Sequence, residues 1–259
     1  MKVQLLPSSI ENGVASQRQR LCTFIVNDSV AIDAGSLSFS CSDAQRGSVR
    51  HIVLSHTHLD HIAGLPIFVD DLFATLTSPV QVHATQAMID VLEANVFNWD
   101  VYPRFSELEN EFGPVLEYRP FDFDVSFQIG SLEFTAIAVD HHGPSAGFIV
   151  RDGSSVVAFT GDTSATVEFW SALNREVALD AVFIECAFPD RLGELAEKSH
   201  HLSPSLLASE LEKLAAPTNH IFVSNIKASY RDEVVDEIER LRIPNLEVLT
   251  VDKIYEFPS

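Results

Sequence analysis

The sequence has few residues that could cross-link it and no segment that could anchor it. Three cysteines occur among 259 residues, an odd number without a Cys-x-x-Cys pair, which argues against a disulfide framework. Reduced thiols are typical of the cytoplasm. No apolar run is long enough to span a bilayer, and residues 1–16 lack the apolar core of a secretory signal. We therefore expect a cytoplasmic protein that does not bind membranes.

Basic residues are also scarce. The chain has 17 Lys and Arg against 37 Asp and Glu, a formal net charge of −20. A surface this acidic repels polyanions, so binding to long DNA or RNA is disfavoured. A small anionic substrate is compatible with this charge, because a bound divalent cation can reverse the local electrostatic field. Solubility, or adaptation to a salty habitat, is an equally good reason for the charge.

What is present is an alternation of short apolar runs with helical patterns. Helices are expected after Thr85, after Ser203-Pro204, and along the apolar stripe Val234, Val235, Ile238 and Leu241. The runs typical of strands covered on both faces are His51–Ser55, Val80–Ala84, Leu132–Val139, Val156–Thr160, Ala181–Glu185, Ile221–Ser224 and Leu246–Val251. The alternation predicts the α/β class, and we expect one domain over residues 1–259.

Residues 97–127 differ from this pattern. The segment is rich in aromatic residues, prolines and acids and has no clear period. We interpret it as an ordered aromatic loop or cap, since long non-periodic segments of compact domains are often functional. Stacking on a base and a plain hydrophobic contact are both open as its role.

A group of metal-binding side chains follows the first of these strands. His56, His58, Asp60 and His61 lie within six residues at the end of His51–Leu54. Imidazole nitrogens and carboxylate oxygens are ligands for divalent zinc, manganese or iron. We therefore predict a site for one or two divalent ions that activate water, with zinc as the first expectation and manganese, iron or magnesium as alternatives.

Further candidate ligands follow two later strands. His141 and His142 come after Leu132–Val139, and Asp162 comes after Val156–Thr160. Side chains at successive strand ends gather at one edge of a sheet, where α/β sites usually lie. A carboxylate such as Asp162 can bridge two cations, an arrangement used in two-metal hydrolysis.

The motif His56-x-His58-x-Asp60-His61 resembles the signature of the metallo-β-lactamase superfamily. Asp33 in the Asp-x-Gly after Val30–Ile32, His141, Asp162 and the last strand match the family's other motifs in order, so the resemblance covers nearly the whole chain. It implies a four-layer αββα sandwich with the metals at one edge.

Within this superfamily, several segments look like the class II cyclic-nucleotide phosphodiesterases. They are residues 58–65, 96–99, 102–103, 183–189 and 199–204. The resemblance implies that His56, His58 and His141 hold one metal, that Asp60 and His61 hold the other, and that Asp162 bridges them. The third histidine can be aligned on His141 or His142, and we prefer His141. The resemblance also makes Asp60 and His201 the catalytic residues, with His201 near the phosphate.

One position departs from the family pattern. Asn225 occupies the place of the last histidine ligand. An amide oxygen is a weaker and uncharged ligand that suits hard cations better than zinc. The second site is therefore expected to be weak, to take manganese or magnesium, or to be empty.

The resemblance implies a metal-dependent hydrolase that cleaves 3′,5′-cyclic nucleotides. The alternatives are another hydrolase on the same fold, acting on RNA 3′ ends, sulfate esters or lactones, and an oxygen-reducing di-iron protein, although such proteins usually carry Glu in place of His58. A metal-degenerate binding protein is a third alternative, supported by Asn225. A homodimer is expected because it is the commonest oligomer.

Overall fold

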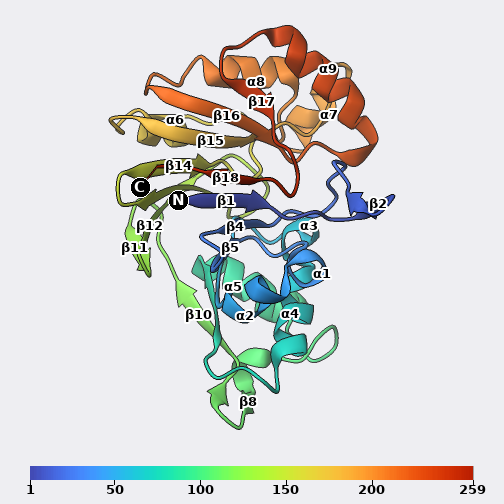
Figure 1. Cartoon of the computed structure of the whole chain (residues 1–259), viewed down its shortest axis with the longest axis vertical. Coiled ribbons are helices and arrows are strands. Elements are labelled where there is room, and N and C mark those ends of the chain that lie inside the picture. Colours follow the sequence, from blue (N-terminus) through green and yellow to red (C-terminus); the bar gives the residue numbers. More distant parts are fainter. Residues whose placement is uncertain (259) are drawn as a thin grey trace.

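Two seven-stranded β-sheets lie face to face in the middle of the molecule (Figure 1). The structure is a computed structural model and describes residues 1–258. The first sheet has the order β10 (Leu116–Pro120), β7 (Val80–Ala84), β6 (His51–Val53), β5 (Val30–Ile32), β4 (Phe24–Val26), β1 (Lys2–Leu5) and β18 (Ile254–Glu256). Because β1 pairs with β18, the two ends of the described chain lie side by side.

The second sheet is built mainly from the C-terminal half of the chain. Its order is β11 (Ser126–Ile129), β12 (Leu132–Ala138), β13 (Ala146–Asp152), β14 (Ser155–Phe159), β15 (Leu179–Glu185), β16 (Thr218–Ser224) and β17 (Leu246–Val248). Strands β14 to β17 are parallel, as are β5, β6, β7 and β10 of the first sheet. Parallel neighbours end at the same edge of their sheet, and that edge holds the site described below.

Helices cover the outer face of each sheet (Figure 1). On the first sheet these are α1 (Leu37–Ser40), α2 (Asp43–Ser48), α3 (Leu59–Ile62), α4 (Gly64–Leu72) and α5 (Gln86–Asn95). On the second they are α6 (Glu168–Leu173), α7 (Gly193–Lys198), α8 (Pro204–Leu211) and α9 (Arg231–Leu241). The predicted α/β class and four-layer αββα sandwich are confirmed.

The sheets are joined by an aromatic contact. Phe24 on β4 lies 5.2 Å from Phe159 and 5.5 Å from Phe183, measured between ring centroids, and all three rings are buried. Burying a Phe side chain stabilises the fold by about 1.5–3 kcal/mol. The rings therefore fix how the two halves meet, directly behind the candidate site.

Residues 97–127 form short elements and no long open loop. They contain a 3₁₀ turn (Phe105–Glu107), a small hairpin of β8 (Glu109–Asn110) and β9 (Gly113–Pro114), and strand β10. Phe97, Phe105 and Phe121 are buried in the hydrophobic core. The hairpin lies at the end of the molecule remote from the second sheet (Figure 1).

Most expected element boundaries are close to those observed. Val80–Ala84 matches β7, and Thr85 caps α5, where its Oγ1 accepts a hydrogen bond from the Met88 backbone N–H. Ser203 precedes α8, but its hydroxyl donates to Asp190 and does not cap the helix. Local signals located these elements, whereas the partner of Ser203 came from tertiary packing.

Over residues 1–258, none of the helices combines the length and the apolar character needed to cross a bilayer.

A hairpin and two short turns complete the fold. A two-stranded hairpin of β2 (Ile10–Glu11) and β3 (Val14–Ala15) extends from the edge of the molecule, and two further 3₁₀ turns span Asp190–Leu192 and Ala228–Tyr230. The second of these turns directly follows the candidate site residues Asn225 and Lys227.

Candidate metal centre

The histidine motif leaves the end of β6 and turns at once into helix α3. The turn packs on the neighbouring chain, where the Cys22 and Ala34 N–H groups donate to the carbonyls of Asp60 and His61 at 2.8 and 2.7 Å. A Cβ on Gly35 would lie 1.9 Å from the Asp60 carbonyl oxygen. Glycine is therefore required at this point, because only a residue without a side chain allows so close an approach.

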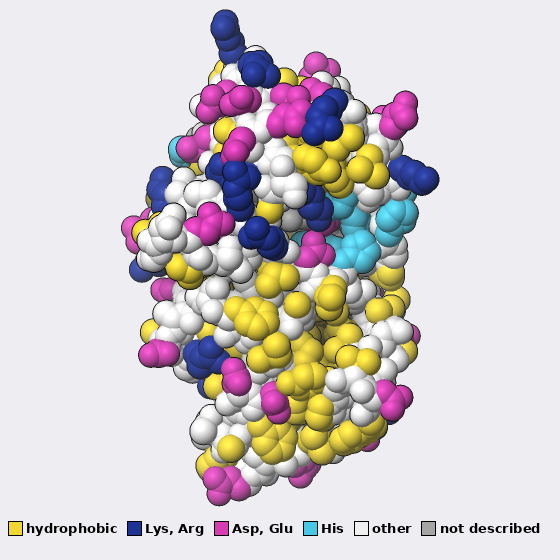
Figure 2. Space-filling view, turned by 90° about the vertical axis from the view of Figure 1, so that its right-hand side faces the viewer, with side chains coloured by type: hydrophobic (Ala, Val, Ile, Leu, Met, Phe, Trp, Pro, Cys, Tyr) yellow, Lys and Arg dark blue, Asp and Glu magenta, His cyan; other side chains and the backbone are white. Residues whose placement is uncertain are grey.

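Three histidines from both halves of the molecule form the first group of ligand atoms. His56, His58 and His141 place ring nitrogens within 4.8 Å of one another. His58 Nδ1 lies 3.0 Å from His141 Nε2, and the His56 ring centroid is 4.7 Å from that of His58. Figure 2 shows histidine side chains gathered at one place on this face of the molecule.

Hydrogen bonds behind the rings set which nitrogen carries the proton. His141 Nδ1 donates to the His200 carbonyl at 2.8 Å, so its Nε2 is free of a proton in the neutral ring. Ser55 Oγ donates a hydrogen bond to Asp33 at 2.7 Å. The same oxygen lies 3.0 Å from His56 Nδ1 and can accept a hydrogen bond from it. Such partners orient a ligand and select its tautomer. Both Nε2 atoms are thereby prepared to bind a cation.

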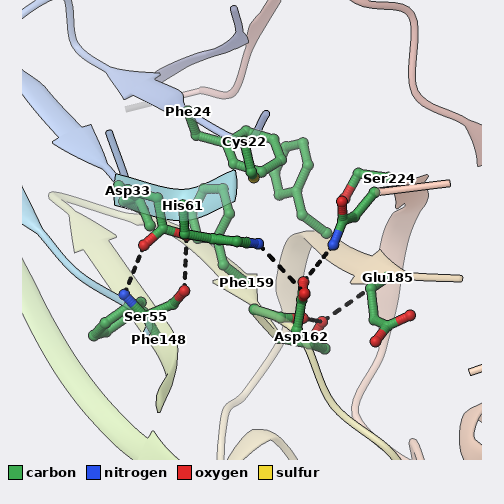
Figure 3. Close-up of a pocket in the computed structure, with 15 residues that line it drawn as sticks. Cys22, Phe24, Asp33, Ser55, His61, Phe148, Phe159, Asp162, Glu185 and Ser224 are labelled. Atoms are coloured by element: carbon green, nitrogen blue, oxygen red, sulfur yellow. Dashed lines mark hydrogen bonds and ion pairs between the residues drawn. The ribbon is translucent and has the colours of Figure 1, made fainter. Parts of the chain in front are cut away.

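A second group joins this one. His56, His61 and Asp162 also have ligand atoms within 4.8 Å of one another, and His61 Nε2 lies 3.3 Å from Asp162 Oδ2. His61 stands between Asp33 and Asp162 in the pocket of Figure 3. Burial works to raise the pKa of Asp162, but the neighbouring His61, His56 and His201 outweigh it and hold that pKa well below its usual range. Asp162 is therefore an anion at the centre of the site.

The donor set fits a divalent cation. His56 Nε2 and His61 Nε2 are buried and make no hydrogen bond within residues 1–258, although Asp162 Oδ2 lies 3.9 and 3.3 Å from them. An unpaired buried polar atom costs about 1–3 kcal/mol. Two imidazole nitrogens facing a buried carboxylate would be satisfied by a metal ion, which accepts this ligand chemistry.

His201 lies on the far side of the same group. His141, Asp162 and His201 form a further set within 4.8 Å. Glu185, at the end of β15, accepts a hydrogen bond from His201 Nδ1 at 2.6 Å and others from the N–H groups of Thr163 and Leu202. Burial lowers the pKa of His201, but Glu185 reverses this and the net change is upward. Glu185 thus holds His201 in place and favours its protonated form.

Two predicted ligands have other partners. Asp60 Oδ2 lies 3.3 Å from Lys227 Nζ, and within residues 1–258 Asp60 joins no group of three or more potential ligands. Asn225 donates from Nδ2 to Asp162 Oδ1 at 2.5 Å. The structure therefore brings His56, His58, His61, His141, Asp162 and His201 together and places Asp60 and Asn225 at the rim, in contact with protein groups.

The adjacent histidines separate clearly. His141 is buried within the group, whereas His142 is exposed, with its Nε2 3.4 Å from the Lys198 carbonyl. The geometry favours His141 as the third histidine of the cluster.

Sequence reasoning did not foresee how Asp33 and Ser55 act. Asp33 accepts hydrogen bonds from His61 Nδ1 at 2.6 Å and from the Ser55 N–H at 2.8 Å. Asp33 has φ +60°, and His200 and Asn225 share this left-handed conformation. Backbone strain of this kind concentrates at functional sites. The available signal was the position of Asp33 at the end of β5, beside the end of β6.

Comparison with known proteins places the chain in a family. The family model described as "Beta-lactamase superfamily domain" matches residues 29–221. A "Probable 3′,5′-cyclic-nucleotide phosphodiesterase" of Yersinia pestis is 26% identical over 72% of this chain and 59% of its own length. A "3′,5′-cyclic-nucleotide phosphodiesterase" of Aliivibrio fischeri is 30% identical over 64% of this chain and 53% of its own. The chain thus spans little more than half the length of these curated relatives.

A solved structure supports the fold. Unliganded yeast PDE1 superposes with a TM-score of 0.77 and covers 98% of both chains at 16% sequence identity. At this identity the likeness concerns the fold alone, and it agrees with the four layers described above.

Proposed function

Because the chain belongs to the metallo-β-lactamase superfamily, we propose that it is a metal-dependent phosphodiesterase that hydrolyses 3′,5′-cyclic nucleotides. The observation that carries this proposal is the convergence of His56, His58, His141, His61 and Asp162 at one sheet edge with His201 beside them. The two curated relatives named for this activity support it. Since the chain covers 59% and 53% of their lengths, the activity and substrate of the whole protein are part of the proposal.

The metal ligands follow from the two groups. His56, His58 and His141 would hold one divalent cation, and His61 and Asp162, with Asp60, would serve a second. Zinc suits the imidazole-rich group best, and manganese, iron or magnesium are the alternatives. A bound divalent cation would act as a Lewis acid and lower the pKa of water to about 7.

The protein's own groups would orient the substrate and move protons. His201, tied through Nδ1 to Glu185, keeps Nε2 for the phosphate or for the departing sugar oxygen. The Asp60 carboxylate is about one-third exposed (31%) at the mouth of the site and can accept a hydrogen bond from the incoming water. The buried Asp33 and Ser55 keep the histidines fixed, so that no reorganisation is needed during the reaction.

Charge supports a small substrate. A net charge of −20 repels a long nucleic acid, whereas a cyclic nucleotide carries one negative charge and would meet a cation and Lys227 at the site.

The experiment is a hydrolysis assay of purified protein reloaded separately with zinc and manganese. The substrates are 3′,5′-cyclic AMP, 3′,5′-cyclic GMP and bis-p-nitrophenyl phosphate as a generic diester. We expect cleavage of a cyclic nucleotide and a loss of activity of at least about a hundredfold in His56→Ala, because second-sphere changes alone cost 10–100-fold. His220→Ala, which removes an exposed histidine on β16, is the matched control and should keep full activity.

Turnover of the generic diester alone would show that 3′,5′-cyclic nucleotides are not the substrate. No turnover with either metal would favour a binding protein instead.

A cytoplasmic location and a homodimer also belong to the proposal. Cys22, Cys41 and Cys186, the three cysteines of the described chain, are free thiols, which suits a reducing compartment. The dimer rests on general frequency and stays a prediction.

A further inference from the structure

We infer that this site binds one divalent cation tightly, on His56, His58 and His141, and a second cation only weakly, because Lys227 and Asn225 already engage the carboxylates on which the second would depend. The inference builds on the proposed metal-dependent function but concerns how many cations are bound and how tightly. It can therefore fail or succeed independently of the substrate.

The ligand atoms of the first cation site contact one another and no lysine or amide, since His58 Nδ1 lies 3.0 Å from His141 Nε2. His56 and His141 have their Nδ1 atoms occupied by Ser55 and by the His200 carbonyl, so the opposite nitrogens face the site. His56 Nε2 is buried and has no hydrogen-bond partner in residues 1–258. A cation bound here gains three imidazole ligands, replaces the contact between His58 and His141, and displaces no lysine ammonium.

Lys227 is the first obstacle at the second place. Its ammonium lies 3.3 Å from Asp60 Oδ2, and the two side chains are similarly accessible at 34% and 31%. This contact directs the lysine side chain at the carboxylate that a second cation would use. A cation bound by Asp60 must displace this ammonium or sit beside it, and like charges at short range repel strongly.

Asn225 is the second obstacle. Its Nδ2 donates to Asp162 Oδ1, so this side chain presents a donor to the shared carboxylate. To act as a ligand it would have to rotate its amide, give up that bond and offer an uncharged oxygen, a weaker ligand for zinc than imidazole. Lys227 and Asn225 both come from the turn after β16, so one short segment opposes the second cation.

Histidine can replace asparagine here without new backbone strain. Asn225 has φ +52°, and His, like Asn, is several-fold enriched among residues with positive φ. The Asn225→His variant therefore tests ligand chemistry and not chain conformation.

The experiment measures how many cations bind and how tightly each binds. Apo protein is titrated with ZnCl₂ by isothermal titration calorimetry, and bound zinc is counted by elemental analysis after equilibrium dialysis. We expect one tight equivalent in the natural protein. Asn225→His should tighten the second cation by about 10–100-fold, the range for changes around a metal ligand. Lys227→Gln should tighten it by about tenfold through loss of the opposing charge.

Two variants serve as matched controls. Asn95→His adds a histidine on the exposed side of α5, and Lys213→Gln removes another ion-paired lysine, held by Glu210 at a distance of 2.6 Å. Neither variant should change the affinity of the protein for the first or the second cation. Two equivalents of similar affinity in the natural protein would overturn the inference, and so would second-site binding that neither Asn225→His nor Lys227→Gln tightens. If Asn225→His fails to fold, the number of cations bound by the natural protein and the affinity of Lys227→Gln for the second cation still test the inference.

Discussion

At the scale of single residues, the site depends on a buried aspartate that holds the histidine motif in place. Asp33 is 2% exposed and accepts hydrogen bonds from Ser55 N, Ser55 Oγ and His61 Nδ1 at 2.6 to 2.8 Å. It therefore fixes the end of β6 and the orientation of His61 together. Its backbone is left-handed, at φ +60°, a conformation that aspartate adopts more readily than most residues.

We predict that Asp33→Ala lowers the free energy of unfolding of the metal-free protein by about 3 kcal/mol or more. Three buried donors lose their acceptor, and each unpaired group costs about 1–3 kcal/mol. Urea denaturation in the presence of a chelator measures the change. Asp124→Ala is the matched control, since Asp124 also has a positive φ (+61°) but is exposed. Equal losses in both variants would assign the effect to the backbone conformation alone.

At the scale of elements, β6 and β7 carry a second histidine pair outside the site. His51 Nδ1 lies 3.1 Å from His83 Nε2, and the His83 ring stacks on Phe127 of β11 with centroids 5.6 Å apart. Burial, then His51 and Arg119, lower the pKa of His83 from 6.5 to about 4. One ring must donate and the other accept, so the contact is made only while at least one ring is neutral.

This pair predicts an acid-sensitive contribution to stability. The unfolded chain takes up a proton on His83 near pH 6.5, whereas the folded chain does so only near pH 4. Stability should therefore be fully present above pH 6.5 and fall as the pH drops to 4, by at most about 3 kcal/mol. Urea denaturation across this range should show that loss in the natural protein and a smaller one in His83→Gln. An equal loss of stability in the natural protein and in His83→Gln would contradict this prediction. The control His220→Gln changes an exposed histidine and should lose as much stability as the natural protein.

Local signals predicted the elements better than the contacts between them. Val80–Ala84 and the helix after Thr85 were identified from apolar periodicity and a cap, because those features are decided within a few residues. The apolar spacing of Leu207, Leu211 and Leu214 predicts a helix that reaches Leu214, but α8 ends at Leu211. Where a helix stops depends on neighbours that the local pattern does not contain.

At the scale of the whole molecule, strand order predicted which residues would meet. His56 and His58 follow β6 of the first sheet, whereas His141 and Asp162 follow β12 and β14 of the second, and the facing sheets bring these ends together. The pairing of Asp60 with Lys227 spans 167 positions along the chain. No local pattern encodes such a contact, so the sequence indicated Asp60 and Asn225 as ligands without revealing their protein partners.

Because its ligands come from both sheets, a bound cation should tie the two halves of the molecule together. Zinc at about 100 times its dissociation constant should raise the free energy of unfolding by about 2.7 kcal/mol. For a chain of this size that corresponds to about 5–10 °C in melting temperature. Scanning calorimetry with ZnCl₂ and with a chelator measures the shift, which His141→Ala should abolish. His142→Ala alters the exposed neighbour and should retain it. The reverse pattern would make His142 the ligand, and no shift in the natural protein would mean that the cation does not hold the halves together.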